Sequence, residues 1–185
     1  FEEFARLARE GSFVPVCKEL MADLLTPVSA FLKVAEYSDY SFLLESVEGG
    51  EQVARYSFLG KDPLLVLRAD SHRTLVEQAG KTTVAGGTIV EELRRVMGEY
   101  RAPSVPGLPR FTGGAVGFLG YDAAGWFEPA VRRAGDCPVP AVFMVFDTIL
   151  AFDHVRHRIL VIANARVTPG ADLEAWLDDQ MAEQF

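Results

Sequence analysis

The sequence predicts an α+β domain in which largely antiparallel sheets are flanked by helices. Three observations lead to this class: short apolar runs bounded by turn residues, one long pair of apolar runs joined by a polar turn, and segments with clear helix start signals. The chain has 185 residues, of which 49% are hydrophobic and 24% charged, so it can bury the core of one domain or of two small ones.

Two helices are expected in the first quarter of the chain. The first covers its start, where apolar residues recur on one face before a glycine: Phe1, Phe4, Leu7 and Ala8. The second begins at Thr26-Pro27, because a threonine hydroxyl caps free amides and the first helical position does not need the N–H that proline lacks. The residues predicted to form its apolar face are Val28, Phe31, Leu32 and Ala35.

The strongest helix signal covers residues 88–101. Thr88 and Glu91 have the spacing of a capping box, in which each side chain binds the other residue's backbone N–H. The apolar positions that follow recur at helical spacing and form one stripe: Ile89, Val90, Leu93, Val96, Met97 and Tyr100. We therefore expect a helix that packs this stripe against a sheet.

Short strand patterns lie between and after these helices, each bounded by glycine, aspartate or proline. They cover residues 40–47, 54–59, 64–68, 74–77, 82–85 and 111–118. Later, the almost unbroken apolar run 141–152 is mirrored by 158–167 across the polar turn 153–157, which predicts a long hairpin. Because near-continuous apolarity indicates strands covered on both faces, helices or a second sheet must lie over them.

Composition excludes two classes of partner. The 18 lysines and arginines against 26 aspartates and glutamates give a net charge of −8 without a basic block, so nucleic acid is not expected. The longest apolar runs fall far short of the roughly 20 residues that cross a membrane. Two cysteines, Cys17 and Cys137, make no disulfide framework, and no secretory leader opens the sequence, so a cytoplasmic protein is expected.

The Gly80-Lys81-Thr82 segment has the ending of a phosphate-binding loop. That loop requires a glycine five residues before Gly80, and Leu75 stands there. Without this glycine the backbone does not wrap a phosphate, so nucleotide binding is not expected. Gly80-Lys81 is instead interpreted as the tight turn of a hairpin.

A second glycine-rich segment contains Gly113, Gly114, Gly117 and Gly120. It lacks the glycine spacing of a dinucleotide-binding loop, and no βαβ unit with a distant acidic residue follows it. Glycines within a strand indicate a bulge or the close approach of another backbone or of a ligand. The pattern alone does not choose between these explanations.

Few residues of this chain suggest catalysis. His154 and His157 lie beside Asp153, but no third histidine or cysteine is near, so all three are interpreted as solvated turn residues. Asp147 interrupts an apolar run, where a bulge or a bond to the backbone is the ordinary explanation. His72 is the remaining histidine, so no hydrolytic pair and no catalytic or metal-binding residue is assigned to this chain.

Four segments in a fixed order resemble one protein family. They are TPVSAFLK at 26–33, LLES at 43–46, RYSFLG at 55–60 and GGAVGFLGYD at 113–122, and the segments FDT at 146–148 and FDH at 152–154 fit as well. Together they resemble the N-terminal region of anthranilate synthase component I. The resemblance covers nearly the whole chain and implies the layered α/β/β/α architecture of chorismate-utilising enzymes.

This resemblance implies an activity that belongs to a longer protein. Component I makes anthranilate and pyruvate from chorismate and ammonia, with Mg²⁺ as cofactor and a glutamine amidotransferase subunit as the source of ammonia. Its chorismate and Mg²⁺ residues lie in a C-terminal catalytic region. We therefore expect residues 1–185 to be the N-terminal, tryptophan-regulatory region, without catalytic activity by itself.

The resemblance also implies a feedback site for L-tryptophan. In the family the LLES segment is the best-known contributor to that site, beside others in the C-terminal region, and the match assigns Ser46, Glu45 and Leu44 to it. A strand end offers unpaired backbone groups to the charged ends of an amino acid, and apolar neighbours suit an indole. The family's GGAVGFLGYD strand is expected to pack against the catalytic region.

Two other functions stay open at this stage. One is the large subunit of aminodeoxychorismate synthase, a sister enzyme of folate synthesis that shares fold and substrate, although the LLES and RYSFLG segments favour the tryptophan pathway. The other is a stand-alone amino-acid-binding module. The helical pattern that continues to the last residue argues against the module and leads us to expect a longer protein.

Overall fold

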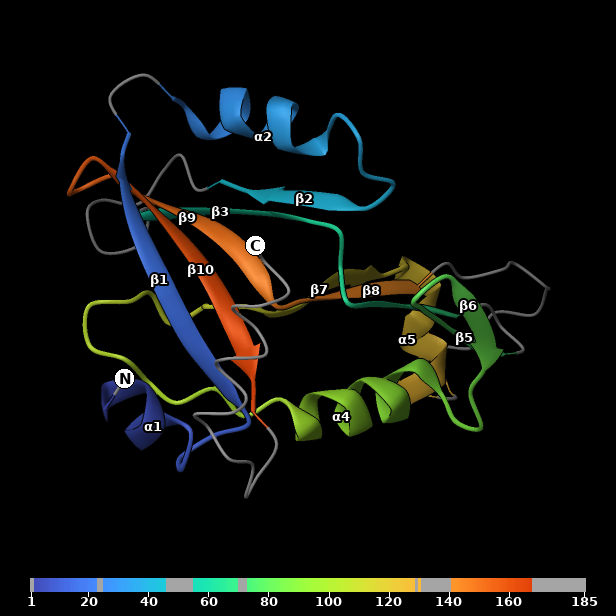
Figure 1. Ribbon diagram of the computed structural model, residues 1–185. Helices are drawn as coiled ribbons and strands as arrows, with labels where there is room; N and C mark the ends of the chain where they lie inside the picture. The colour runs from blue at the N-terminus through green and yellow to red at the C-terminus, as the bar shows by residue number, and fades with distance from the viewer. Residues whose placement is uncertain are drawn as a thin grey trace.

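The computed structural model describes residues 2–22, 25–45, 55–69, 73–128, 130 and 141–167 (Figure 1). Its strands form two five-stranded antiparallel sheets, as predicted. Sheet A has the order β1 (Phe13–Met21), β10 (Arg158–Arg166), β9 (Thr148–Asp153), β3 (Tyr56–Lys61) and β2 (Ser41–Leu44). Sheet B has the order β6 (Lys81–Val84), β5 (Thr74–Gln78), β4 (Leu65–Ala69), β8 (Ala141–Phe146) and β7 (Gly114–Leu119).

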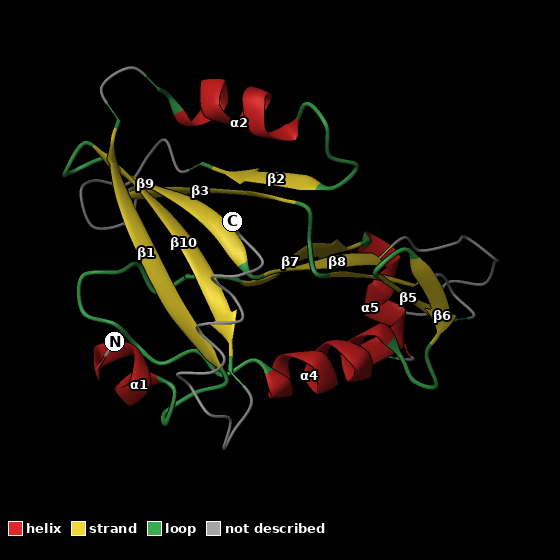
Figure 2. Ribbon diagram, in the orientation of Figure 1, coloured by secondary structure: helices red, strands yellow, loops and turns green. Residues whose placement is uncertain are grey.

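The helices of the described residues are α1 (Glu2–Leu7), α2 (Pro27–Ala35), α4 (Ile89–Glu99) and the short α5 (Ala124–Phe127), which follows a 3₁₀ turn, η1 (Tyr121–Ala123). Figure 2 shows α2 lying over β2 and β3, and α4 lying beside sheet B. In the described part of the chain no helix is long and apolar enough to cross a membrane.

Three apolar cores separate four layers. Between α2 and sheet A lie Ala30, Leu59, Phe152 and Ile159. Between the two sheets lie Phe42, Phe146, Ile149, Ala151, Leu160 and Ile162. Between sheet B and α4 lie Leu65, Leu67, Ala69, Ile89, Val96, Ala141 and Val145. The order helix, sheet, sheet, helix is the layered architecture that the sequence predicted, and it explains why the apolar strands need cover on both faces.

The chain passes from one sheet to the other at two corners. Strand β3 turns into β4 at residues 62–64, and β8 turns into β9 at the single residue Asp147. The predicted long hairpin is therefore half right. Its turn at 154–157 joins β9 to β10, but the run 141–152 is two strands in different sheets, because Asp147 bends it.

Asn164 of β10 holds the Asp147 corner against the start of β7. Its side-chain amide donates hydrogen bonds to the carbonyls of Thr112 at 2.7 Å and Asp147 at 2.8 Å. The backbone N–H of Asn164 also donates to the Asp147 carbonyl at 2.9 Å. Asn164 is buried, so these bonds form where water does not compete, and they fix the place where the two sheets meet.

Three local predictions about helices and turns are confirmed. The helices α2 and α4 begin at the expected caps, since Thr26 accepts from the Ser29 N–H at 3.1 Å and Thr88 from the Glu91 N–H at 3.3 Å. The apolar stripe of α4 packs on sheet B as expected. A tight turn joins β5 and β6, although its positive-φ residues are Ala79 and Gly80, one position earlier than predicted.

One prediction about an apolar face is corrected, and one strand was missed. Helix α2 does not bury Val28 and Leu32, which are exposed; it packs through Ala30, Phe31 and Val34 instead. The edge strand β1 was not predicted, because Pro15 and the polar residues after Cys17 break the apolar pattern. It pairs with β10 over nine residues, and proline is tolerated there because the outer side of an edge strand needs no N–H donor.

The glycine-rich strand β7 is approached closely by the backbone of β8. A side chain at Gly117 would place its Cβ 2.0 Å from the carbonyl oxygen of Val142 and 2.7 Å from the Cα of Phe143. No side chain fits at those distances. At this position the structure therefore favours close backbone packing, one of the explanations that the sequence left open.

Candidate functional site

The LLES segment ends the edge strand β2. Leu44 is the last residue of this strand and lies opposite Phe58 of β3, and Glu45 follows it in an exposed position. The Leu44 side chain is 49% exposed although it is apolar. Ser46, the third residue predicted for the site, lies outside the described residues. Two of the three predicted residues therefore lie at the exposed C-terminal end of β2.

An aromatic surface continues from Leu44 across β3. Tyr56 and Phe58 lie on the same face of the strand, with ring centroids 5.9 Å apart. Phe58 in turn contacts the edge of Phe111 at 5.3 Å, which anchors it on the core between the sheets. Leu44, Phe58 and Tyr56 together form a partly exposed apolar strip at the end of sheet A, which we call the β2–β3 strip.

A buried ion pair closes this end of the sheet. Arg55, which precedes β3, donates from Nε and one terminal nitrogen to the two carboxylate oxygens of Asp153 at 3.1 and 2.9 Å. The Asp153 carboxylate is completely buried, whereas the Arg55 side chain is 34% exposed. The Arg55 guanidinium also lies 4.8 Å from the centre of the Tyr56 ring, so one cation links the carboxylate to the β2–β3 strip.

The network extends to the opposite edge of sheet A. Arg158 of β10 lies 3.5 Å from Asp153 and also pairs with Glu19 of β1. Burial by itself would raise the pKa of Asp153. Hydrogen bonds from Arg55 and from the backbone N–H of Arg156, together with the positive charges of Arg55 and Arg158, outweigh burial and lower this pKa below its usual range. Asp153 is thus ionised at neutral pH, and its ion pairs connect β9 with Arg55 at the start of β3, with Arg158 of β10 and, through Arg158, with Glu19 of β1.

Beside this network, Ser57 and His154 form a hydrogen bond of 2.7 Å between the serine hydroxyl and Nε2 of the imidazole. The backbone N–H of His154 also donates to the backbone carbonyl of Arg55 at 2.9 Å. Ser57 is completely buried and faces the α2 side of the sheet, so its hydroxyl is not presented to a substrate as a nucleophile. The pair ties the 154–157 turn to β3.

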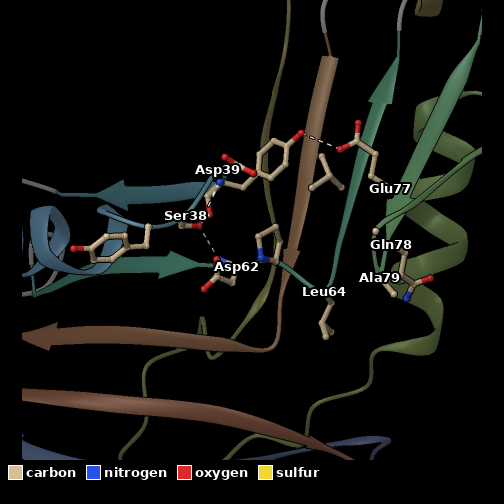
Figure 3. Close-up of a pocket in the computed structure, with 12 residues that line it drawn as sticks. Ser38, Asp39, Asp62, Leu64, Glu77, Gln78 and Ala79 are labelled. Atoms are coloured by element: carbon tan, nitrogen blue, oxygen red, sulfur yellow. Dashed lines mark hydrogen bonds between the residues drawn. The ribbon is translucent and has the colours of Figure 1, made fainter.

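A pocket lies at the other end of β2 (Figure 3). It is formed by the loop 37–40 before β2, the corner 62–64 between β3 and β4, and the turn between β5 and β6. Its volume is about 450 Å³. The LLES residues do not line it, so this pocket and the predicted effector residues are distinct places.

The structure corrects one prediction about this region. Asp153 was taken as a solvated turn residue, but its carboxylate is buried, because Arg55, nearly one hundred positions earlier, is brought beside it by the pairing of β3 with β9. The role of Arg55 was also missed. The sequence did contain a signal for this role, because Arg55 is a charged residue directly before the apolar strand of the RYSFLG segment. In the described ranges no three histidine, cysteine or acidic residues gather to hold a metal ion.

Comparison with known proteins gives a consistent result. The chain is 42% identical over 169 residues to anthranilate synthase component 1 of Synechocystis sp. and 40% identical over 170 residues to that of Acetivibrio thermocellus, covering 89% and 90% of this chain. The chain is thus similar to a part of anthranilate synthase component I, the family that its segments resemble. It spans about one third of the length of these relatives, 33% and 34%. No protein-family model matches the chain.

The fold agrees with this family. The crystal structure of anthranilate synthase component I from Streptococcus pneumoniae matches 89% of this chain and 36% of its own length, with a TM-score of 0.50 and 24% identity. At this identity the match concerns the fold alone. The two antiparallel sheets and their helices are thus an arrangement found within a component I protein.

Proposed function

We propose that this chain is the N-terminal regulatory region of an anthranilate synthase component I. The identity of about 40% over nine tenths of the chain carries the proposal. The full-length protein would make anthranilate and pyruvate from chorismate and ammonia in tryptophan biosynthesis, in the cytoplasm. The name component 1 of the relatives supports a second component, which we propose to be a glutamine amidotransferase subunit.

In this proposal the chemistry belongs to the remaining two thirds of the protein. Chorismate and Mg²⁺ would bind there, and residues 1–185 alone would be inactive. The length of the chain supports this division, because it spans about one third of its relatives. An assay of the full-length protein separates anthranilate from aminodeoxychorismate, and formation of the latter would overturn the proposal.

We place the feedback site for L-tryptophan at the C-terminal end of β2, at Leu44, Glu45 and Ser46. The supporting geometry is the exposed Leu44 beside the aromatic rings of Phe58 and Tyr56, because an indole ring stacks well on such a surface. Within the described residues the ladder with β3 ends at Leu44, so the backbone of Glu45 would be open to the ammonium or carboxylate group of the amino acid.

Regulation would then couple this site to the chorismate site. Tryptophan would favour an arrangement of the two regions that binds chorismate poorly, and linkage makes the antagonism reciprocal. The Arg55–Asp153 network supports such coupling, since it joins the β2–β3 strip to four strands of sheet A. Replacement of Ser46 by alanine in the full-length enzyme should weaken inhibition by tryptophan, and unchanged inhibition would contradict the site.

The edge of sheet B that is formed by β7 would face the catalytic region. Strand β7 is an edge strand, and large apolar side chains on it and after it are exposed: Phe118, Leu119, Tyr121 and Phe127. Exposed aromatic residues beside an open sheet edge are typical of a surface that another part of a protein covers. Replacement of Phe118 by aspartate should reduce assembly of the full-length protein into a compact form, measured by limited proteolysis.

A further inference from the structure

The outer face of sheet A, which points away from sheet B, is covered only in part by the described helices. Helix α2 packs on this face over β2 and β3 (Figure 2). At the other edge of the sheet, α1 covers Val14 at the start of β1 through Leu7. Between these two helices, the outward positions of β1 and β10 have no helix of the described residues packed on them.

The pairing of β1 with β10 defines this open surface. Leu160 and Ile162 of β10 point into the core between the two sheets, so the odd-numbered residues of β10 point outward. Their direct partners in β1 are even-numbered and share the outer face with them. The open surface, which we call the β1–β10 face, consists of Val16, Lys18, Leu20, Val161 and Ala163.

The β1–β10 face is apolar apart from one charge. Val16 is 52% exposed and Leu20 is 42% exposed, and Ala163, directly opposite Val16, is exposed as well. Lys18 lies between the two exposed apolar residues of β1, and among the described residues it forms no ion pair. Apolar side chains that lie side by side on neighbouring strands are typical of a surface that another element covers.

The sequence that follows β10 has the pattern of such an element. Residues 172–185 lie outside the described residues, and their sequence has apolar residues at helical spacing: Leu173, Trp176, Leu177 and Met181. A helix over residues 172–185 would be about 21 Å long, which exceeds the roughly 14 Å from Val16 to Leu20 along β1. One helix would therefore cover the whole β1–β10 face.

The connection and the charges favour the same segment. Strand β10 ends at Arg166, beside α1, and Pro169 and Gly170 follow as turn residues, so the chain can return over β10 after a short connection. The residues 172–185 include five aspartates and glutamates and no lysine or arginine. This charge complements the Lys18 ammonium, the single charge of the β1–β10 face.

We propose that residues 172–185 form a helix that docks on the β1–β10 face. Its apolar stripe, with Trp176 as the largest side chain, covers Val16 and Ala163, and its carboxylates lie near Lys18. Helices then cover both the β1–β10 half and the β2–β3 half of the outer face, which agrees with the near-continuous apolar sequence of β10. This proposal goes beyond the regulation by tryptophan and does not depend on it.

The first test measures how accessible the β1–β10 face is in the full-length protein. Val16→Cys, in a background with Cys17→Ser and Cys137→Ser, is labelled with a thiol reagent and compared with Val84→Cys on β6, whose valine is 65% exposed. A docked helix should make labelling at position 16 at least about tenfold slower than at position 84, because the reagent must wait for local opening. Equally fast labelling at both positions would overturn the proposal.

The second test identifies what covers the face. Trp176→Ala should raise the labelling rate of Val16→Cys at least about tenfold, whereas Tyr37→Ala, an exposed aromatic residue at the end of α2, should leave the rate unchanged. In addition, Leu173→Cys or Leu177→Cys should form a disulfide with Val16→Cys and not with Val84→Cys, found by mass spectrometry of the joined peptides. Slow labelling that Trp176→Ala does not change, without either disulfide, would show another occupant and overturn the proposal.

Discussion

Sheets A and B have similar size and topology but are stabilised by different interactions. One end of sheet A is held by a buried carboxylate with two arginines, which together with Glu19 link four of its five strands. Sheet B is held by apolar packing under α4 and by the close contact of the β7 and β8 backbones at Gly117. The stability of sheet A should therefore respond to charge and pH, and that of sheet B to side-chain volume.

The largest effect is expected in sheet B, from Gly117→Val. Its Cβ would lie 2.0 Å from the Val142 carbonyl oxygen, so β7 must separate from β8. We expect a loss of about 3 kcal/mol or more in the free energy of unfolding, or no folded protein. The control is Gly98→Ala on α4, where an added Cβ meets no atom within 4 Å. It should stabilise the protein by about 0.5–1 kcal/mol, measured by denaturant unfolding.

The junction of the two sheets is tested by Asn164→Asp. The amide donates to two carbonyl oxygens, and a carboxylate would lose both bonds and place a negative charge beside them. A cost of about 3 kcal/mol is expected. Asn164→Leu, which removes the bonds without adding a charge, should cost less. Equal stability of the two variants would contradict the role of the charge at this junction.

In sheet A, Asp153→Asn should cost about 2 kcal/mol at neutral pH, because charge-assisted bonds from Arg55 are lost. The sign of the pH dependence follows from the lowered pKa of Asp153 in the folded protein. The stabilisation is complete above the unfolded value, about 3.9, and disappears as the pH falls through the lower folded value. The difference between wild type and Asp153→Asn should therefore shrink in acid, measured by unfolding at several pH values.

A matched control for this pH effect is Asp62→Asn. Asp62 also has a lowered pKa, mainly through hydrogen bonds from Lys61 and Ser38, but its side chain is 59% exposed. Solvent screens such a pair, so its loss should change stability little at any pH. If Asp62→Asn cost as much as Asp153→Asn, burial would not be what distinguishes sheet A.

The smallest effects concern the two helix caps. Thr26→Ala on α2 and Thr88→Ala on α4 each remove one bond to a backbone N–H and should cost about 1 kcal/mol. Loss of the Thr88 cap should cost slightly more, because the Thr88 hydroxyl also donates a hydrogen bond to the Glu91 carboxylate, which alanine cannot do. Helicity and unfolding midpoints of the two variants check this order.

Local chemistry made much of the fold predictable. Caps, turn residues and the stripe of α4 depend on residues a few positions apart, and each was found from the sequence. The pattern failed where distant elements decide the outcome. Helix α2 has two overlapping apolar faces, and the face that contains the small Ala30 is the one that packs on sheet A. Strand β1 is stabilised by its pairing with β10 over nine residues, which its own sequence pattern does not indicate.

The candidate site was predictable in part for the same reason. Leu44 and Glu45 were assigned to the tryptophan site by resemblance, which stays a prediction, and they lie at an exposed strand end. The pairing of Arg55 with Asp153 joins residues nearly one hundred positions apart, which no local pattern connects. The pocket at the N-terminal end of β2 likewise combines three segments that become neighbours when the two sheets form.

The most direct test of the regulatory assignment is a calorimetric titration of the full-length protein with L-tryptophan, with D-tryptophan as the control. The assignment predicts stereoselective binding that Leu44→Asp weakens at least about tenfold, because a charge replaces the apolar contact for the indole. Leu32→Asp, on the exposed side of α2, should leave the binding unchanged. Stereoselective binding that survives Leu44→Asp, or no binding by the wild-type protein, would contradict it.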